Sequence, residues 1–146
     1  MRGPWVSLPT LAATEEFGAR LARLARPGDV ILLEGPLGAG KTTLARALLR
    51  AAVGNPGLEV PSPSFTLVQT YETAIGRVHH FDLWRLDGPG RLTELGWDEA
   101  LQDIVLVEWP DRLGPLRPVE ALTVALRYGE GEAREAALTG WEDRLK

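Results

Sequence analysis

Three short runs of apolar residues predict the strands at the centre of a sheet. Residues 29–33 and 104–107 are almost continuously apolar, which is typical of parallel strands that are buried on both faces. Residues 122–128 alternate between apolar and polar side chains, as in a strand with one solvated face. The pattern therefore predicts a sheet with a buried parallel core.

Two segments have the spacing of apolar residues that is expected of amphipathic helices. The first lies between a candidate N-cap at Thr10 or Thr14 and a helix breaker at residues 27–28, and its apolar stripe consists of Phe17, Leu21, Leu24 and Ala25. The second runs from residue 41 to about residue 53, and its stripe consists of Leu44, Ala47, Leu48 and Ala51. Gly54 is a candidate C-cap for this second helix.

The rest of the chain is rich in short strands and turns. The expected hairpins pair residues 67–71 with 77–81 and residues 122–128 with 133–139. Shorter expected elements are an edge strand at residues 5–8 and a loop at residues 85–90. A short helix is expected at residues 92–97, and a second one, capped by Asp98, at residues 98–101. Because strands alternate with helices early and hairpins dominate late, we predict one α/β domain over residues 1–146. It should have a mixed sheet with a parallel core, antiparallel additions and flanking helices.

A glycine-rich stretch between the first core strand and the second helix fits G-x-x-x-x-G-K-[ST], the phosphate-binding loop. Its nine residues are Gly35, Pro36, Leu37, Gly38, Ala39, Gly40, Lys41, Thr42 and Thr43. The glycines can adopt positive φ and turn backbone N–H groups inward around a phosphate. Lys41 can reach the β- and γ-phosphates, and Thr42 offers a hydroxyl to Mg²⁺. The order strand, loop, helix predicts a P-loop NTPase-like fold; the alternative is a glycine-rich turn without a ligand.

Two carboxylates are candidates for the second half of such a site, which must hold Mg²⁺ at the end of a neighbouring strand. Asp82 follows the predicted strand at residues 77–81, and Glu108 follows the strand at residues 104–107. In a parallel sheet both acids would lie at the carboxyl edge, where ligands bind. The alternative is that one of them caps a turn.

Aromatic and imidazole side chains near these acids are less specific signals. Trp109 follows Glu108 directly, at the edge expected for a nucleotide, although tryptophans such as Trp84 are more often core or interface anchors. His79 and His80 are adjacent on a predicted strand, so their side chains should face opposite sides and diverge as zinc ligands.

Composition limits the choice of partners and compartment. The chain has no cysteine, so it uses neither a disulfide nor a thiolate metal site, which fits a cytoplasmic protein. The formal net charge is −4 and there is no basic run, so we expect any connection with nucleic acid to be made through a protein partner. No apolar run approaches the length of a membrane span, so no membrane association is expected.

Four segments in this order resemble the bacterial TsaE (YjeE) family: EGPLGAGKTT at residues 34–43, SPSFTLV at 62–68, HFDLWRL at 80–86 and LVEWP at 106–110. The resemblance extends from about residue 8 to residue 128. The last three segments make it specific, because unrelated phosphate-loop proteins lack them. The family is a small ATPase that works with the TsaB–TsaD complex, and with TsaC, in making threonylcarbamoyladenosine in tRNA.

This resemblance implies roles for the candidate residues. Thr42, Asp82 and Glu108 would surround Mg²⁺, and Lys41 with the loop amides would hold the phosphates of ATP. Glu108 or Asp82 would orient the attacking water. The segment at residues 62–66, with Ser64 and Thr66, would act as a switch near the γ-phosphate, and Trp109 would lie beside the nucleotide. The C-terminal turn departs from the family pattern, since Gly131 is followed by Glu132 and the arginine comes only at Arg134.

Other functions remain open from the sequence. A nucleotide or small-molecule kinase would need a second pocket and lid arginines, for which only Arg85 and Arg91 are candidates. A GTPase would need the Asn-Lys-x-Asp sequence, which is absent. A regulatory protein that binds the nucleotide without hydrolysing it differs from a slow ATPase only in turnover.

Overall fold

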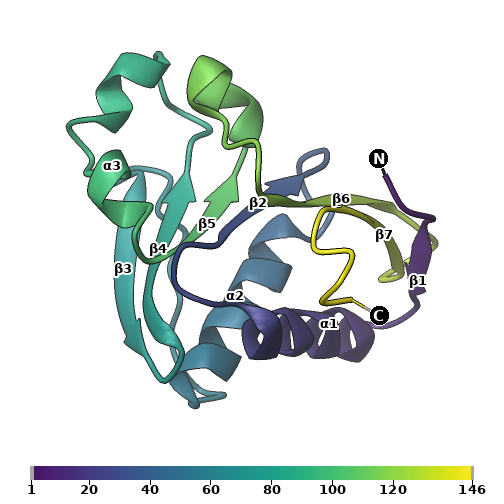
Figure 1. Ribbon diagram of the computed structural model, residues 1–146. Coiled ribbons are helices and arrows are strands. Elements are labelled where there is room, and N and C mark those ends of the chain that lie inside the picture. Colours follow the sequence, from purple (N-terminus) through teal and green to yellow (C-terminus); the bar gives the residue numbers. More distant parts are fainter. Residues whose placement is uncertain (1, 146) are drawn as a thin grey trace.

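The apolar runs form the middle of a single seven-stranded sheet with the order β1-β7-β6-β2-β5-β4-β3 (Figure 1). The structure is a computed structural model that describes residues 2–145. Strand β2 (Val30–Glu34) lies between β5 (Ile104–Glu108) and β6 (Leu122–Tyr128) and is parallel to both. Strand β4 (Gly76–Asp82) is parallel to β5 on its other side. The predicted parallel core is confirmed.

Antiparallel strands complete both edges of the sheet, as predicted. Strand β3 (Val68–Thr73) pairs with β4, β7 (Arg134–Thr139) pairs with β6, and β1 (Val6–Leu8) pairs with β7. The turn between β3 and β4 is shorter than the expected residues 72–76. The Thr73 hydroxyl closes it by accepting the N–H of Ile75 at 3.1 Å and donating to the carbonyl of Gly76 at 2.5 Å.

Helices cover both faces of the sheet. Helices α1 (Leu11–Leu24) and α2 (Lys41–Val53) pack side by side on one face (Figure 1). Their shared core includes Leu21, Leu48, Ile31, Leu33 and Leu106. The opposite face carries a second core, with Leu32, Phe81, Trp97 and Val105. The elements over it are η1 (Pro89–Leu92), α3 (Trp97–Ala100) and η2 (Pro110–Leu116).

Side-chain alternation along the central strands decides which residues face α2. Val78, Leu33 and Leu106 belong to the core beneath α1 and α2, whereas Phe81 and Val107 belong to the other. Because alternate residues of a strand share a face, Asp82 and Glu108 lie on the α2 side of the sheet.

Of the two candidate caps for α1, Thr10 is the N-cap and accepts the N–H of Ala13. Local structure differs from prediction at three places. The short helix expected at residues 92–97 is replaced by η1 and α3, because Gly96 is left-handed (φ 81°) and starts α3 itself. Asp98 therefore lies inside α3 and does not cap it. The helical turn η2 after Trp109 was not predicted.

None of the helices in residues 2–145 is long and apolar enough to cross a membrane.

The contact between α1 and α2 requires a glycine, which gives a first prediction. A Cβ on Gly18 would lie 2.7 Å from the Cβ of Ala47 and 3.0 Å from the backbone nitrogen of Leu48. Alanine favours helices by about 1 kcal/mol over glycine, but overpacking costs about 1–3 kcal/mol. We expect Gly18→Ala to lower the free energy of unfolding, measured by urea denaturation. Gly88→Ala is the control, since a Cβ there meets open space; equal effects of the two would contradict the tight helix contact.

Candidate functional site

The glycine-rich loop turns sharply from β2 into α2. Gly35, Gly38 and Gly40 have φ of 144°, 80° and 104°, in the left-handed region that favours glycine. A Cβ on Gly35 would lie 2.5 Å from the carbonyl oxygen of Leu126 on β6, so no side chain fits there. The predicted use of these glycines for positive φ is confirmed, and Lys41 and Thr42 begin α2 directly after them.

Side chains from the C-terminal hairpin hold the outer side of this loop. The Tyr128 hydroxyl donates to the carbonyl of Leu37, and the Arg134 guanidinium donates to the carbonyl of Gly38 at 3.4 Å. Tyr128 and Arg134 are paired across β6 and β7, and the guanidinium lies 5.1 Å from the tyrosine ring. The hairpin thus fixes two carbonyls of the loop.

Lys41 is buried at the base of the loop, with 4% of its surface exposed. Its Nζ donates to the carbonyl of Gly35 and, at 3.0 Å, to that of Pro36. The ammonium also lies 3.9 Å from the ring centroid of Trp109. Burial lowers the pKa of Lys41, and the negative charges of Glu108, Asp82 and Asp111 oppose that shift.

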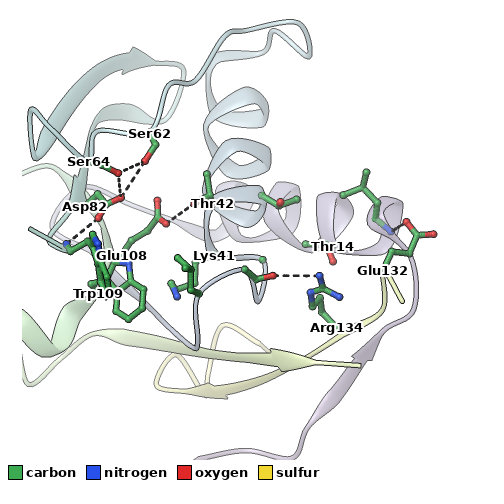
Figure 2. Close-up of a pocket in the computed structure, with 16 residues that line it drawn as sticks. Thr14, Lys41, Thr42, Ser62, Ser64, Asp82, Glu108, Trp109, Glu132 and Arg134 are labelled. Atoms are coloured by element: carbon green, nitrogen blue, oxygen red, sulfur yellow. Dashed lines mark hydrogen bonds between the residues drawn. The ribbon is translucent and has the colours of Figure 1, made fainter. Parts of the chain in front are cut away.

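Two carboxylates meet at the carboxyl edge of the sheet, as predicted. Asp82 and Glu108 are register partners at the ends of β4 and β5, and both are buried. The Thr42 hydroxyl donates to Oε1 of Glu108 at 2.9 Å (Figure 2). This hydrogen bond joins the start of α2 to the end of β5, so it connects the threonine after the glycine-rich loop to one of the two carboxylates.

Asp82 is held from a different direction. Its Oδ2 accepts hydrogen bonds from the hydroxyls of Ser62 at 3.2 Å and Ser64 at 3.1 Å (Figure 2). Its Oδ1 accepts the backbone N–H of Trp84 at 3.1 Å. The segment before β3 is therefore tied to the same edge of the sheet as the loop.

Trp109 packs against the buried lysine. Its backbone is left-handed, with a φ of 60° that is uncommon for a tryptophan. Its ring lies 4.4 Å from that of Trp84. The Trp109 ring lies beside Lys41 (Figure 2), and both tryptophans line the same cleft as the two carboxylates.

These parts enclose one cleft of about 350 Å³. Its walls come from the loop and α2, the two carboxylates with Ser62 and Ser64, the two tryptophans, and a far end formed by Leu11, Thr14, Glu132 and Arg134. A buried cation, helix-terminal N–H groups, a hydroxyl and two carboxylates can together bind a phosphate chain with a hard divalent cation.

Comparison with known proteins assigns the family. A family model described as threonylcarbamoyl adenosine biosynthesis protein TsaE matches residues 8–136. The chain belongs to the TsaE family. Relatives named tRNA threonylcarbamoyladenosine biosynthesis protein TsaE agree with this. The Rickettsia bellii protein is 34% identical over 127 residues, covering 86% of this chain and 88% of the relative. For Bacillus subtilis the identity is 32% over 135 residues, covering 91% and 83%.

A shorter match and a solved structure complete the comparison with the TsaE family. A 39% identical stretch of 99 residues covers 67% of this chain but only 57% of the Rickettsia felis TsaE. The crystal structure of Bacillus subtilis YdiB has a TM-score of 0.78 and 27% identity, and the alignment covers 99% of this chain and 88% of that one. The family and the fold expected from the sequence are both confirmed, and the family ties this chain to threonylcarbamoyladenosine biosynthesis.

Some residues expected at the TsaE site do not line the cleft. Gly35, Pro36 and Ala39 form the back of the loop, where two of them supply the carbonyls that bind Lys41. Thr66 is exposed, and its hydroxyl accepts from the side chain of Gln69 at 3.5 Å. The reason is a turn in which the N–H of Leu67 donates to the carbonyl of Pro63 at 2.6 Å, so that residues 65–66 lie at an exposed tip.

Other residues at the site were missed from the sequence. His80 is buried beside Glu108, and Nε2 lies 2.7 Å from Oε2; the signal was its spacing two residues before Asp82, which puts both on one face of β4. Arg134 lines the cleft, although the departure of the C-terminal turn from the TsaE pattern had argued against it.

The two histidines diverge, as expected. His79 bonds Asp103 at 2.8 Å and Thr70 at 3.1 Å on the other face of β4. Within residues 2–145 no group of three or more His, Cys, Asp or Glu side chains is arranged to hold a metal ion. A metal at this edge would therefore need ligands beyond the two carboxylates.

The burial of Lys41 generates a second prediction. In Lys41→Met an apolar side chain of similar length replaces a buried ammonium. The variant loses the hydrogen bonds of the ammonium, but it no longer pays the desolvation free energy of a buried charge, and the two effects offset each other. We expect the free energy of unfolding without ligand to stay within about 1 kcal/mol of the parent. Mg-ATP, the ligand predicted from the sequence, should stabilise the parent by about 2.7 kcal/mol at 100 times its dissociation constant, but not the variant.

Thermal melts with and without Mg-ATP measure this difference. Arg26→Met removes an exposed cation outside the cleft and serves as the control. A Lys41→Met variant that gains as much stability from Mg-ATP as the control would show that this lysine does not hold the phosphates.

Proposed function

We propose that this chain binds ATP with Mg²⁺ and hydrolyses it slowly, as a partner-dependent component of the machinery that makes threonylcarbamoyladenosine in tRNA. The observation that carries the proposal is the joining of the phosphate loop to the carboxylate edge through the hydrogen bond from Thr42 to Glu108. Membership of the TsaE family supplies the pathway.

The loop has the features that a triphosphate requires. Its left-handed glycines allow backbone N–H groups to turn toward a phosphate, and α2 adds the positive end of a 13-residue helix. Lys41 is already desolvated there, so an anion would replace the loop carbonyls as its partner. Gly38, Gly40, Lys41, Thr42 and Thr43, which all line the cleft, would hold the phosphates.

The donor set at the carboxylate edge fits Mg²⁺. Magnesium prefers oxygen ligands and keeps several waters, so one or two carboxylates, a hydroxyl and substrate phosphates suffice. Thr42 and Asp82 would contact the ion directly or through its water, with Glu108 beside them. When bound, the ion neutralises charge on the phosphates and draws electrons from the γ-phosphate.

The chain's own residues would then favour attack by water. Lys41 and the loop N–H groups stabilise negative charge that develops on the phosphate oxygens. Glu108 or Asp82 orients the water by accepting its proton in a hydrogen bond. Arg134 lies across Lys41 from Glu108 (Figure 2), so no arginine among residues 2–145 lines the cleft beside the carboxylates, where the γ-phosphate would lie. Hydrolysis by residues 2–145 alone should therefore be slow.

The partner that we propose is the TsaB–TsaD complex, with TsaC and tRNA as indirect partners. A net charge of −4 does not favour direct binding of an RNA backbone. The reaction on tRNA would belong to the partners, in the cytoplasm, and this chain would supply ATP turnover.

A kinase role has less support. Arg85 lies 4.5 Å from the ring of Phe65, and Arg91 approaches Glu94 at 3.7 Å. Neither of these two candidate lid arginines lines the cleft.

The third prediction concerns nucleotide choice and dependence on the partner. ATP should bind more tightly than GTP, because the guanine-reading sequence is absent. Phosphate release should be slow for the isolated chain and rise about tenfold or more with TsaB–TsaD, since a partner can supply groups that the site lacks. Phosphate release and calorimetry measure both. Brisk GTP hydrolysis that ignores the partner would refute the proposal, and ATP binding without hydrolysis under all conditions would favour the regulatory binder.

The fourth prediction separates the two acids. Glu108→Gln should retain the affinity for ATP within a few-fold while turnover falls, as for a group that acts in the transition state. Asp82→Asn should also weaken Mg²⁺-dependent binding, because it removes a charge that would face the ion. Trp109 fluorescence reports binding, and phosphate release reports turnover.

Glu59→Gln is the matched control, since Glu59 is exposed and outside the cleft. If Glu108→Gln hydrolyses ATP as fast as this control, the water must be oriented by Asp82 or by the segment at residues 62–66.

A further inference from the structure

His80 lies in β4 on the face that packs against the core beneath α2. Val78, two residues earlier on the same face, and Leu106, its register partner on β5, both belong to the core beneath α2. The side chains of His80 and Glu108 are only 1% and 2% exposed. Burying a polar ring costs stability unless it is hydrogen-bonded, so packing alone does not account for a histidine here.

The hydrogen bonds identify which ring nitrogen carries the proton. Nε2 of His80 lies 2.7 Å from Oε2 of Glu108, and an ionised carboxylate can only accept. Nδ1 is buried and has no partner among residues 2–145. Because an unpaired buried N–H is rarer than an unpaired acceptor, the proton belongs on Nε2 and Nδ1 carries a lone pair.

We propose that His80 is a positioning residue that acts through Glu108, an inference that rests on the ATPase function proposed above. With His80 donating to Oε2 and Thr42 donating to Oε1, both oxygens of Glu108 are held. The hydroxyl proton of Thr42 then points at Glu108, which leaves its oxygen lone pairs toward the cleft where Mg²⁺ would bind. His80 itself does not line the cleft, so its effect on the reaction passes through the carboxylate.

The imidazole suits this task because its N–H direction is fixed once the ring is packed. Partners of this kind orient the groups that contact a metal, and their loss typically costs about 10–100-fold in affinity or activity. Without the N–H, Oε2 of Glu108 would be a buried acceptor with no donor, and the carboxylate would be free to rotate away from Thr42.

A double-mutant cycle tests whether His80 acts through Glu108. His80→Phe should lower kcat about 10–100-fold with TsaB–TsaD present, while KM for Mg-ATP stays within about threefold. His80→Gln, which offers an amide N–H on a side chain of similar length, should recover most of the loss. In a Glu108→Gln background, His80→Phe should cause no further loss. Independent, multiplicative losses, or an effect on KM alone, would overturn the proposal.

His79→Phe is the matched control, because His79 bonds Asp103 and Thr70 on the other face of β4. It should keep the kcat of the parent. If His79→Phe lowers kcat as much as His80→Phe does, the effect of His80 comes from packing in the sheet and not from its bond to Glu108. Thermal melts of the unliganded variants show whether each one folds. If His80→Phe does not fold, the glutamine variant and the measurement below still decide the question.

Nitrogen NMR of the imidazole rings tests the hydrogen bond without ligand or turnover. The unliganded parent should show a protonated Nε2 and an unprotonated Nδ1 for His80. Protonation at Nδ1 with a bare Nε2 would overturn the proposal. Lack of hydrolysis by the parent with its partners would instead refute the ATPase function, and the role of His80 with it, whereas normal hydrolysis with an uncoupled cycle would refute only the positioning role.

Discussion

The parallel register of β2, β5 and β4 is the constraint on which the site depends. Strand β5 is hydrogen-bonded to both others, and Glu108 is the register partner of Leu33 on β2 and of Asp82 on β4. The three strands therefore end at one edge of the sheet. The glycine-rich loop follows β2 there, the segment with Trp84 follows β4, and Trp109 follows β5. A slip of one residue would turn Asp82 or Glu108 to the other face of the sheet, away from α2. The positions of the two carboxylates are thus determined by backbone pairing and do not depend on the side-chain contacts that they make.

Sequence patterns could predict the parts of this edge that depend on local signals. The spacing of the glycines and Lys41 is local, as is the acid directly after each of the strands predicted at residues 77–81 and 104–107, and the structure brings Thr42, Asp82 and Glu108 together accordingly. The contribution of the C-terminal hairpin was not predictable, because Tyr128 and Arg134 reach the loop only since β6 lies beside β2, and strand order is a non-local property. The spacing of His80 and Asp82 could have placed them on one face, but the contact of His80 with Glu108 depends on the pairing of β4 with β5, which is also non-local.

Lys41 shows how the site trades stability for binding. Its ammonium is buried against two loop carbonyls and the ring of Trp109, partners that desolvate the charge without neutralising it. Burial lowers its pKa, which means that the folded protein without ligand disfavours the charged form relative to water. An anion in the loop would stabilise the charged ammonium. Part of the free energy of phosphate binding would therefore come from offsetting the desolvation of Lys41.

The two carboxylates differ in what anchors them. Donors from the core hold Glu108, namely His80 on β4 and Thr42 at the start of α2. The donors to Oδ2 of Asp82 come from Ser62 and Ser64, on a surface segment whose tip exposes 82% of Phe65. A carboxylate bonded to the core keeps one position as long as the sheet is intact, whereas one bonded to a surface segment follows that segment when it moves. Since the exposed tip is available to other molecules, we expect the position of Oδ2 of Asp82 to respond to contacts at that tip, while Oδ1 stays bonded to the backbone N–H of Trp84.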